Sequence, residues 1–394
     1  MLRGAFVALW YRTGQQNHIS ADGTLYYEIA GNVTAGRGFR LNGELTSRRP
    51  PGYPLFLAFM IKFFDFPLSV YIAQAVLSAG TCVLVYFLTK QIFDENSAIL
   101  AAAFMAVDYA SIRQVVSVMS EVLFVFFLIA GFFYFYKARD SRKGHHFLLS
   151  GIFMAAALLV REVILYFIPL FVAVLWIWKK QWKITTRMLV FYILGILLMI
   201  SPWSIRNSLL YGKPVLFGTT AGHTLYFGNN PTVPDHFTGG DWELGLDTNF
   251  PKDPHLPPLF TVQADRYFYS KAIEFIRENP ERFLKLTGEK VVNMWRPYIS
   301  DSRWPAKIGM SVTYLPVIFL GIAGMALSAR QWPAFWPIYL LIGYLVIIHA
   351  FTISHIRYRF PIMPFIMIFG GYAAALLQKK IQQQRKTVSQ FGVL

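Results

Sequence analysis

The chain has 394 residues, of which 55% are hydrophobic and 15% are charged, and its mean hydropathy is +0.43. Soluble domains carry about 25% charged residues, so this composition excludes an ordinary soluble enzyme and predicts a multi-span membrane protein. The formal net charge of +16 does not indicate nucleic-acid binding, because the basic residues gather in short loops between apolar runs. The single cysteine, Cys82, excludes a disulfide framework and a Cys-based metal site.

The first apolar run, Leu2–Trp10, is shorter than the roughly 17–25 residues of a spanning helix. We expect a shortened first helix here, or a start codon placed too late. A polar loop over residues 11–65 follows, with a helix predicted for Gly23–Ala30 and an amphipathic helix for Tyr53–Phe64. Asp22 precedes the first of these helices, so an N-cap is one role open to it and a catalytic role is another.

Nine later apolar runs are candidates for spanning the membrane. They are Phe66–Leu88, Ser97–Arg113, Met119–Tyr136, Phe147–Val160, Val163–Trp178, Met188–Pro202, Ile308–Leu327, Trp332–Ala350 and Pro361–Leu377. Phe147–Val160 and Val163–Trp178 fit two spans joined by a tight turn or one broken element. We favour two spans, because the loop charges then alternate, and expect nine or ten transmembrane helices in all.

The short loops predict which side of the membrane each segment occupies. Clusters of Lys and Arg follow alternate spans, and the positive-inside rule assigns them to the cytoplasmic side. They are Lys137, Arg139, Arg142, Lys143, Lys179, Lys180, Lys183, Arg187, Arg330, Lys379, Lys380, Arg385 and Lys386. The first loop, the turns at Arg113 and Arg161, residues 204–307 and the turn His355–Arg359 are then expected on the outer side.

Residues 204–307 form the one sizeable polar segment, which we expect to be a cap on the membrane domain. Thr261–Glu278 is predicted to be a helix that ends at Pro280, and Arg282–Trp295 a second, amphipathic helix. The predicted organisation is therefore a transmembrane domain over 1–203 with a first outer loop at 11–65, a cap over 204–307, and C-terminal helices with a basic tail over 308–394.

Ionisable side chains at the ends of spans are costly and mark candidate sites. Glu121 follows Ser120 at the outer end of its helix, where it either complements the helix dipole or serves a site, and we weight the site slightly higher. A single outer arginine ordinarily reaches toward lipid headgroups, but five on one face favour an anion-binding cavity, since guanidinium suits phosphate. The five are Arg113, Arg161, Arg206, Arg357 and Arg359.

The first loop places an acid near two arginines whose backbone is held. Arg48 and Arg49 precede Pro50 and Pro51, which fix the local backbone. A carboxylate such as Asp22 could act as a general base or hold a divalent cation. His223, His236 and His255 lack a metal-ligand spacing, so we expect no cofactor, although a divalent cation remains open.

Taken in order, these motifs resemble the GT-C glycosyltransferases of the dolichyl-phosphate-mannose protein mannosyltransferase and aminoarabinose lipid A transferase type. The matching pieces are Asp22 with Tyr26, Arg49-Pro50-Pro51 with Gly52-Tyr53-Pro54, Ser120-Glu121, Leu158-Leu159-Val160-Arg161, Pro202-Trp203-Ser204-Ile205-Arg206-Asn207 with Gly212, Gly222 to Gly228-Asn229-Asn230-Pro231, and Arg357-Tyr358-Arg359-Phe360-Pro361. The resemblance implies an all-α polytopic fold of GT-C type in the bacterial cytoplasmic membrane. It also implies inverting transfer from a polyprenyl (undecaprenyl) phosphate sugar on the outer face.

The resemblance further implies residue roles. Asp22 would activate the acceptor, Glu121 would be a second acid, and Arg49 would bind the lipid phosphate. Tyr26, Arg48 and Asn229 would join the five outer arginines in substrate binding. The acceptor would be a glycan, a lipid or a protein, and membrane lipids would surround the chain. A lipid-linked glycan transporter or flippase, an O-antigen ligase or polymerase, and a structural subunit are the competing interpretations.

Overall fold

The computed structural model describes residues 1–13, 19–180, 182–218, 220–234, 256–257, 261–298 and 302–391. Within these residues the chain forms sixteen α-helices, three short 3-10 helices and one two-stranded hairpin. The predicted all-α polytopic architecture is therefore confirmed.

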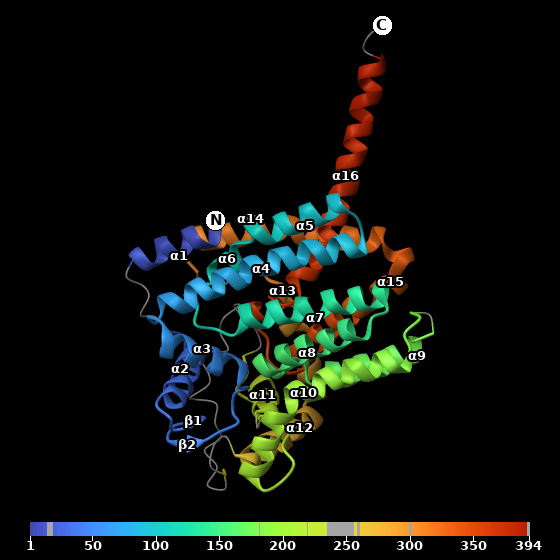
Figure 1. Cartoon of the computed structure of the whole chain (residues 1–394). Helices are drawn as coiled ribbons and strands as arrows, with labels where there is room; N and C mark the ends of the chain where they lie inside the picture. Colours follow the sequence, from blue (N-terminus) through green and yellow to red (C-terminus); the bar gives the residue numbers. More distant parts are fainter. Residues whose placement is uncertain are drawn as a thin grey trace.

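The bulk of the molecule is a bundle of apolar helices, many of which run side by side (Figure 1). They are α4 (Leu68–Ile92), α5 (Glu95–Val107), α6 (Tyr109–Gln114), α7 (Glu121–Ser141), α8 (Gly144–Val160), α9 (Phe167–Trp178), α10 (Thr186–Tyr211), α14 (Trp304–Leu327), α15 (Trp332–Phe351) and α16 (Met363–Phe391). Three 3-10 helices join members of this set: η2 (Glu162–Ile164), η4 (Ala329–Gln331) and η5 (Ile356–Arg359).

Length and composition separate the candidate spans into two groups. Five helical stretches of the described chain are long and apolar enough to cross a membrane: α4, α7, α10, α14 and Ala329–Phe351, which combines η4 with α15. Four shorter apolar stretches are Gly52–Phe63, Glu95–Val107, Gly144–Val160 and Glu162–Trp178. The chain is thus a multi-pass membrane protein, and the expected total of nine or ten spans stays a prediction.

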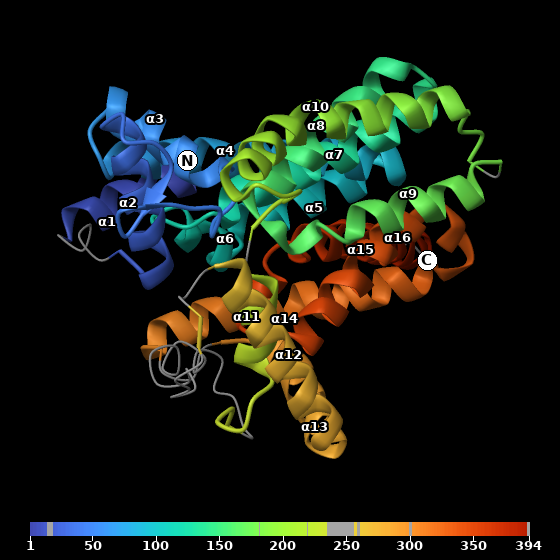
Figure 2. The ribbon, with the colours of Figure 1, turned by 90° about the horizontal axis from the view of Figure 1, so that it is seen from below.

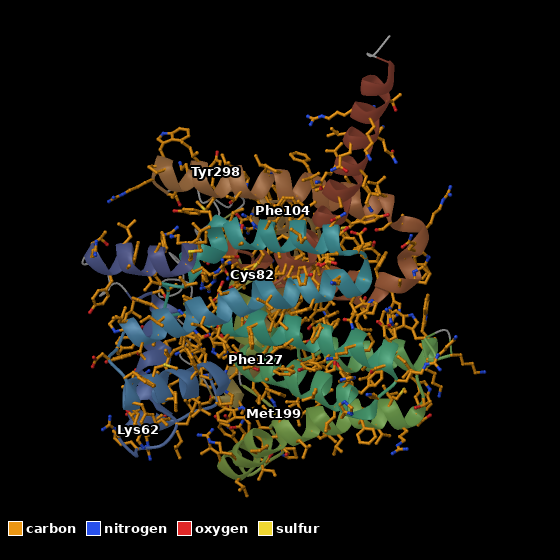
Figure 3. All side chains as sticks on the ribbon, turned by 45° about the horizontal axis from the view of Figure 1, so that its top comes forward. Lys62, Cys82, Phe104, Phe127, Met199 and Tyr298 are labelled. Carbon is orange, nitrogen blue, oxygen red and sulfur yellow. The ribbon has the colours of Figure 1, made fainter. Side chains whose placement is uncertain are left out.

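Glycines let neighbouring helices approach closely. A Cβ atom added to Gly151 of α8 would lie 2.1 Å from the Tyr192 carbonyl of α10, and one added to Gly195 would lie 2.3 Å from the Leu148 carbonyl. Such small-residue contacts are typical of helix pairs in membranes. Apolar side chains cover the helices, as the neighbourhoods of Cys82 and Phe127 illustrate (Figure 3).

Two sequence predictions about helix boundaries are wrong. Ser97–Arg113 is not one span, because α5 ends at Val107 and Asp108 caps α6 through a 2.8 Å hydrogen bond from the Ser111 amide. The span predicted to end at Pro202 continues to Tyr211 as α10. Residue 203 lies inside α10 and residue 307 lies inside α14, and the predicted division into domains stays a prediction.

One end of the bundle carries α1 (Leu2–Arg12), α2 (Ala21–Thr34), the hairpin β1 (Arg40–Leu41) and β2 (Glu44–Leu45), and α3 (Gly52–Phe63) (Figure 1). The hairpin turns at Asn42 and Gly43, which both have positive φ, as a two-residue hairpin turn requires. Ser20, not Asp22, caps α2, since the Ser20 hydroxyl accepts a 3.2 Å hydrogen bond from the Gly23 amide. Asp22 thus lies inside the first helical turn, with its carboxylate available for other contacts.

The described part of the predicted cap consists of α11 (Ala221–Gly228), α12 (Val262–Glu278) and α13 (Pro280–Trp295), which gather beside α14 in Figure 2. Tyr226 and Phe268 bury a small core of their own between α11 and α12. Pro280 does more than end α12, because it also begins α13 at a position where its missing N–H costs nothing.

Candidate functional site

The Asp22 carboxylate lies between two arginines from distant parts of the chain. Its Oδ1 accepts a hydrogen bond from Arg49 Nη2, and its Oδ2 accepts one from Arg357 Nη2 at 2.8 Å. The exposed fractions of the Asp22, Arg49 and Arg357 side chains are 19%, 25% and 17%. The cluster is therefore partly shielded from water, yet a small group can still reach it.

Local structure explains how the three side chains meet. The Ser20 cap fixes the first turn of α2 around Asp22. Pro50 and Pro51, which follow Arg49 and lead into α3, restrict its backbone. His355 accepts a 3.0 Å hydrogen bond from the Arg357 amide and so caps the η5 turn.

The charge environment keeps Asp22 ionised. Burial alone would raise the pKa of its carboxyl group, but the neighbouring guanidinium groups of Arg49 and Arg357 outweigh burial and hold the pKa well below its usual range. Arg161 acts in the same direction from farther away. In this state Asp22 is a weak base.

A second ion pair joins Arg161 to Glu121, and the charge of Arg161 also acts on Asp22. Arg161 Nη1 is 2.6 Å from Glu121 Oε1, and the Glu121 side chain is only 1% exposed. Gln114 donates a 3.4 Å hydrogen bond to the other Glu121 oxygen. Glu121 thus belongs to the same charge network as Asp22, but it is enclosed, and a catalytic role for it stays a prediction.

Tyr26 and Arg48 complete the surroundings of Arg49. The Tyr26 ring centroid is 5.4 Å from the Arg49 guanidinium carbon, and Tyr26 is only 5% exposed. We therefore assign Tyr26 to holding Arg49 through a cation–π contact. Burial first, and then the charge of Arg49, lower the pKa of Arg48 to about 9, so that Arg48 stays cationic at neutral pH.

Of the five arginines predicted to lie on the outer face, Arg161 and Arg357 pair with Glu121 and Asp22, and the other three form no ion pair with either acid among the described residues. Arg206 donates hydrogen bonds to the Thr46 and Phe39 carbonyls at 2.7 and 3.4 Å, and thereby ties the first loop to α10. Arg113 is an exposed residue of α6. Substrate binding by either residue stays a prediction.

Asn229 and Arg359 fasten the cap to the turn that carries Arg357. The Asn229 amide nitrogen donates to the Phe351 carbonyl at 2.8 Å, and Asn229 accepts a 2.9 Å hydrogen bond from Lys290 Nζ. Arg359 donates to the Met294 carbonyl at 3.1 Å. Both side chains are buried, so the structure gives them a positioning role, and direct substrate contact by them stays a prediction.

Sequence reasoning missed Glu162, which follows Arg161 in the η2 turn. Burial raises the pKa of Glu162 to about 7 in spite of the opposing charge of Arg49. Its Oε1 atom is buried without a hydrogen-bond partner among the described residues, and a Cβ on Gly218 would lie 2.2 Å from it. The sequence signal was present, because Glu162, like Glu121, is an acid at the end of an apolar run.

Sequence reasoning also missed Lys290, which is 1% exposed. Burial lowers its pKa to about 7. The helical spacing of Leu286, Lys290 and Asn293 on α13 places all three on the buried face, so periodicity could have identified the lysine.

The described residues contain no group of three His, Cys, Asp or Glu side chains that could hold a metal ion. Positive charge near Asp22 is instead supplied by guanidinium groups. A group that needs cationic contacts, such as a phosphate, fits these donors.

The Asp22 cluster and the basic loops lie at opposite ends of the bundle. Glu121, next to the cluster, begins α7, and Arg139 lies in its last turn. A helix of 21 residues is about 32 Å long, which matches the hydrocarbon core of a bilayer. Arg139, Arg142 and Lys183 line one shallow hollow at that far end, so the structure brings the α7–α8 and α9–α10 loops together.

The family model described as dolichyl-phosphate-mannose-protein mannosyltransferase matches residues 48–205, which include Arg49, Glu121 and Arg161 but neither Asp22 nor Arg357. The oligosaccharyltransferase of Archaeoglobus fulgidus, in complex with Zn and sulfate, superposes with a TM-score of 0.52 at 11% identity over 94% of this chain and 47% of that one. Its apo form gives a TM-score of 0.51 at 14% identity over 94% and 48%.

The chain has a GT-C fold. The resemblance inferred from the ordered motifs is thereby confirmed. This GT-C chain spans about half the length of the oligosaccharyltransferase chains that it matches. ArnT from Cupriavidus metallidurans, bound to undecaprenyl phosphate, is also similar, with a TM-score of 0.48 at 12% identity over 95% of this chain and 76% of that one. No curated protein sequence matches the chain.

Proposed function

We propose that this GT-C protein is a membrane glycosyltransferase that moves a sugar from a polyprenyl (undecaprenyl) phosphate donor to an acceptor. The observation that carries the proposal is the Asp22 carboxylate held between Arg49 and Arg357 at a partly exposed end of the bundle. The description of the matching family, which names a dolichyl-phosphate-linked sugar, supports a donor of this class.

The charges of the cluster favour an anionic donor. Four cationic side chains, Arg48, Arg49, Arg161 and Arg357, face the two carboxylates Asp22 and Glu121. Guanidinium groups bind phosphate oxygens bidentately and remain charged when partly desolvated. A lipid phosphate at this end of the bundle would neutralise the surplus positive charge.

The reaction is a single in-line displacement at the anomeric carbon. The bond from that carbon to the phosphate oxygen breaks, and both electrons stay with the phosphate, where Arg49 and Arg357 stabilise the developing charge. A hydroxyl or amine of a glycan, lipid or protein acceptor forms the new bond from the opposite face and gives its proton to Asp22. One displacement inverts the anomeric configuration.

Transfer takes place on the outer face of the bacterial cytoplasmic membrane in this proposal. The support is the separation of Glu121 and the basic loops by the length of α7, about 32 Å. Because loops rich in Lys and Arg stay in the cytoplasm, the Asp22 end would face outward. The arginines would supply the positive charge that the leaving group requires, so we propose that no metal ion is needed.

Transfer from a labelled donor tests the proposal. Membranes that contain the wild-type chain are incubated with labelled undecaprenyl phosphate sugars, with and without a chelator. We expect label to appear in an acceptor, the chelator to have no effect, and Asp22→Asn and Arg49→Ala to lower the rate by about 10²-fold or more. Lys62→Ala, which removes an exposed cation of α3, is the matched control and should retain the rate.

Three results would contradict the proposal. Full transfer by Asp22→Asn would remove the assignment of the base. Loss of transfer with the chelator would show that a metal is needed. Movement of the lipid-linked sugar across vesicles, without transfer from any lipid donor, would instead favour a transporter.

A further inference from the structure

Asp22 occupies the hydrogen-bond donors that a donor phosphate would use. One guanidinium group bonds each carboxylate oxygen, Arg49 at Oδ1 and Arg357 at Oδ2. A carboxylate held in this way by two cations has little tendency to accept a proton. Asp22 is therefore poorly suited to act as a base while both ion pairs persist.

The two arginines can nevertheless reach another anion. Arg49 and Arg357 are 25% and 17% exposed, whereas the partner of Arg161, Glu121, is 1% exposed. A guanidinium group has five N–H donors, and the contact with Asp22 uses only Nη2 of Arg49, whose Nε is buried and makes no hydrogen bond among the described residues. Arg49 thus has donor capacity beyond its contact with Asp22.

We propose that the phosphate of the lipid donor displaces Asp22 from Arg49 and Arg357, and so frees the carboxylate to accept the proton of the acceptor. This inference rests on the proposed function. Until the phosphate arrives, the ion pairs hold Asp22 inactive. Donor binding therefore precedes activation of the acceptor.

The charges balance through the reaction. Before transfer, the arginines face one negative charge on Asp22 and one on the phosphodiester of the donor. During transfer the anomeric carbon–oxygen bond breaks, its electron pair passes to the leaving phosphate, and the acceptor proton passes to Asp22. Afterwards Asp22 is neutral and the polyprenyl phosphate carries two negative charges, so that the total charge facing Arg49 and Arg357 is unchanged.

Displacement of Asp22 by the phosphate predicts how loss of the Asp22 charge changes phosphate binding. If Asp22 and the phosphate compete for the same cations, then removal of the Asp22 charge strengthens phosphate binding while it abolishes transfer. If Asp22 only positions the two arginines, its removal weakens binding. The two cases predict changes of opposite sign in the affinity for the phosphate, and this affinity can be measured without any enzymatic activity.

The experiment is equilibrium binding of undecaprenyl phosphate to the purified full-length protein in lipid nanodiscs. Wild type is compared with Asp22→Asn and with Asp22→Ser, a shorter variant that also lacks the charge. Glu28→Gln is the matched control, because Glu28 lies in α2 as well and bonds the Asn42 amide rather than either arginine. Thermal unfolding of each variant reports whether it is folded.

We expect both Asp22 variants to bind undecaprenyl phosphate at least about fivefold more tightly than wild type, and Glu28→Gln to bind like wild type. Suppose that wild type binds undecaprenyl phosphate and that the folded Asp22 variants bind it equally well or more weakly. This result would overturn the displacement of Asp22 by the phosphate but would leave the proposed function standing. Absence of binding by every protein, wild type included, would overturn both. If both Asp22 variants are unfolded, Asp22 is a structural residue and the proposed displacement is again wrong.

Discussion

Asp22 and Arg357 are separated by 335 positions in the sequence, yet Arg357 Nη2 lies 2.8 Å from Asp22 Oδ2. The contact joins the first turn of α2 to the η5 turn that follows α15. Together with Arg49 it defines the candidate site.

Replacement of Arg357 should greatly lower the rate of transfer without unfolding the chain. Arg357→Ala removes one of the two cations that would stabilise the leaving phosphate, so we expect the rate of sugar transfer to fall by about 10²–10³-fold. Arg357→Lys should recover only part of the rate, because an ammonium group cannot bond two phosphate oxygens in the planar geometry of guanidinium. A rate for Arg357→Ala within threefold of wild type would remove Arg357 from the site.

The buried pair of Glu121 and Arg161 should matter for stability. Glu121→Gln leaves the Arg161 charge without its partner, and the cost should lie toward the lower end of the roughly 3–5 kcal/mol seen for broken buried pairs, since Arg161 is 18% exposed. Thermal unfolding in detergent measures this as a drop in Tm. The double variant Glu121→Gln with Arg161→Met should regain part of the loss, and a double variant less stable than Glu121→Gln would argue against the pairing.

Glu162 should make stability depend on pH. Because burial raises the pKa of Glu162 from 4.5 to about 7, the folded chain holds a proton there that the unfolded chain releases. The stability that the folded chain gains from keeping Glu162 protonated is fully present below pH 4.5, and it is lost as pH rises through about 7. The Tm of wild type should therefore fall as pH rises from 4.5 to above 7, and Glu162→Gln should make this fall smaller. Glu44→Gln, which changes an exposed hairpin residue, should show the same fall as wild type.

Two glycines of the cap region provide a matched pair. A Cβ on Gly228 would lie 1.6 Å from the Thr352 carbonyl, so Gly228→Ala should push α11 away from the turn that carries Arg357 and lower both Tm and the transfer rate. Gly288 lies in the middle of α13 with open space around it. Gly288→Ala should raise stability by about 0.5–1 kcal/mol and keep the rate, since alanine favours a helix. Equal effects of the two changes would contradict this packing.

The sequence was sufficient for the helical architecture and for most members of the site. Apolar runs predicted the five helical stretches that are long enough to cross a membrane, and the sequence singled out Asp22, Arg49 and Arg357, which the structure brings together. It could not indicate which arginine meets Asp22. That choice depends on the path of the chain between residues 49 and 357, and local periodicity carries no information about it.

The errors have local physical causes. Asp108 interrupts the predicted Ser97–Arg113 span because its side chain caps a new helix, an event that hydropathy does not register. Pro202 lies within α10 and does not end it. The sequence carried a signal for Glu162 and Lys290, but their contacts with Gly218 and Asn229 are tertiary and could not be read from it.

The position of Arg357 after α15 also governs when its contact with Asp22 can form. A ribosome that has made α1 to α14 has produced Asp22 and Arg49, but the η5 turn and α16 are still missing. The newly made protein therefore lacks the Arg357 partner of Asp22 until the η5 turn has been synthesised. An interrupted synthesis would release a chain with only one of the two cations that hold Asp22.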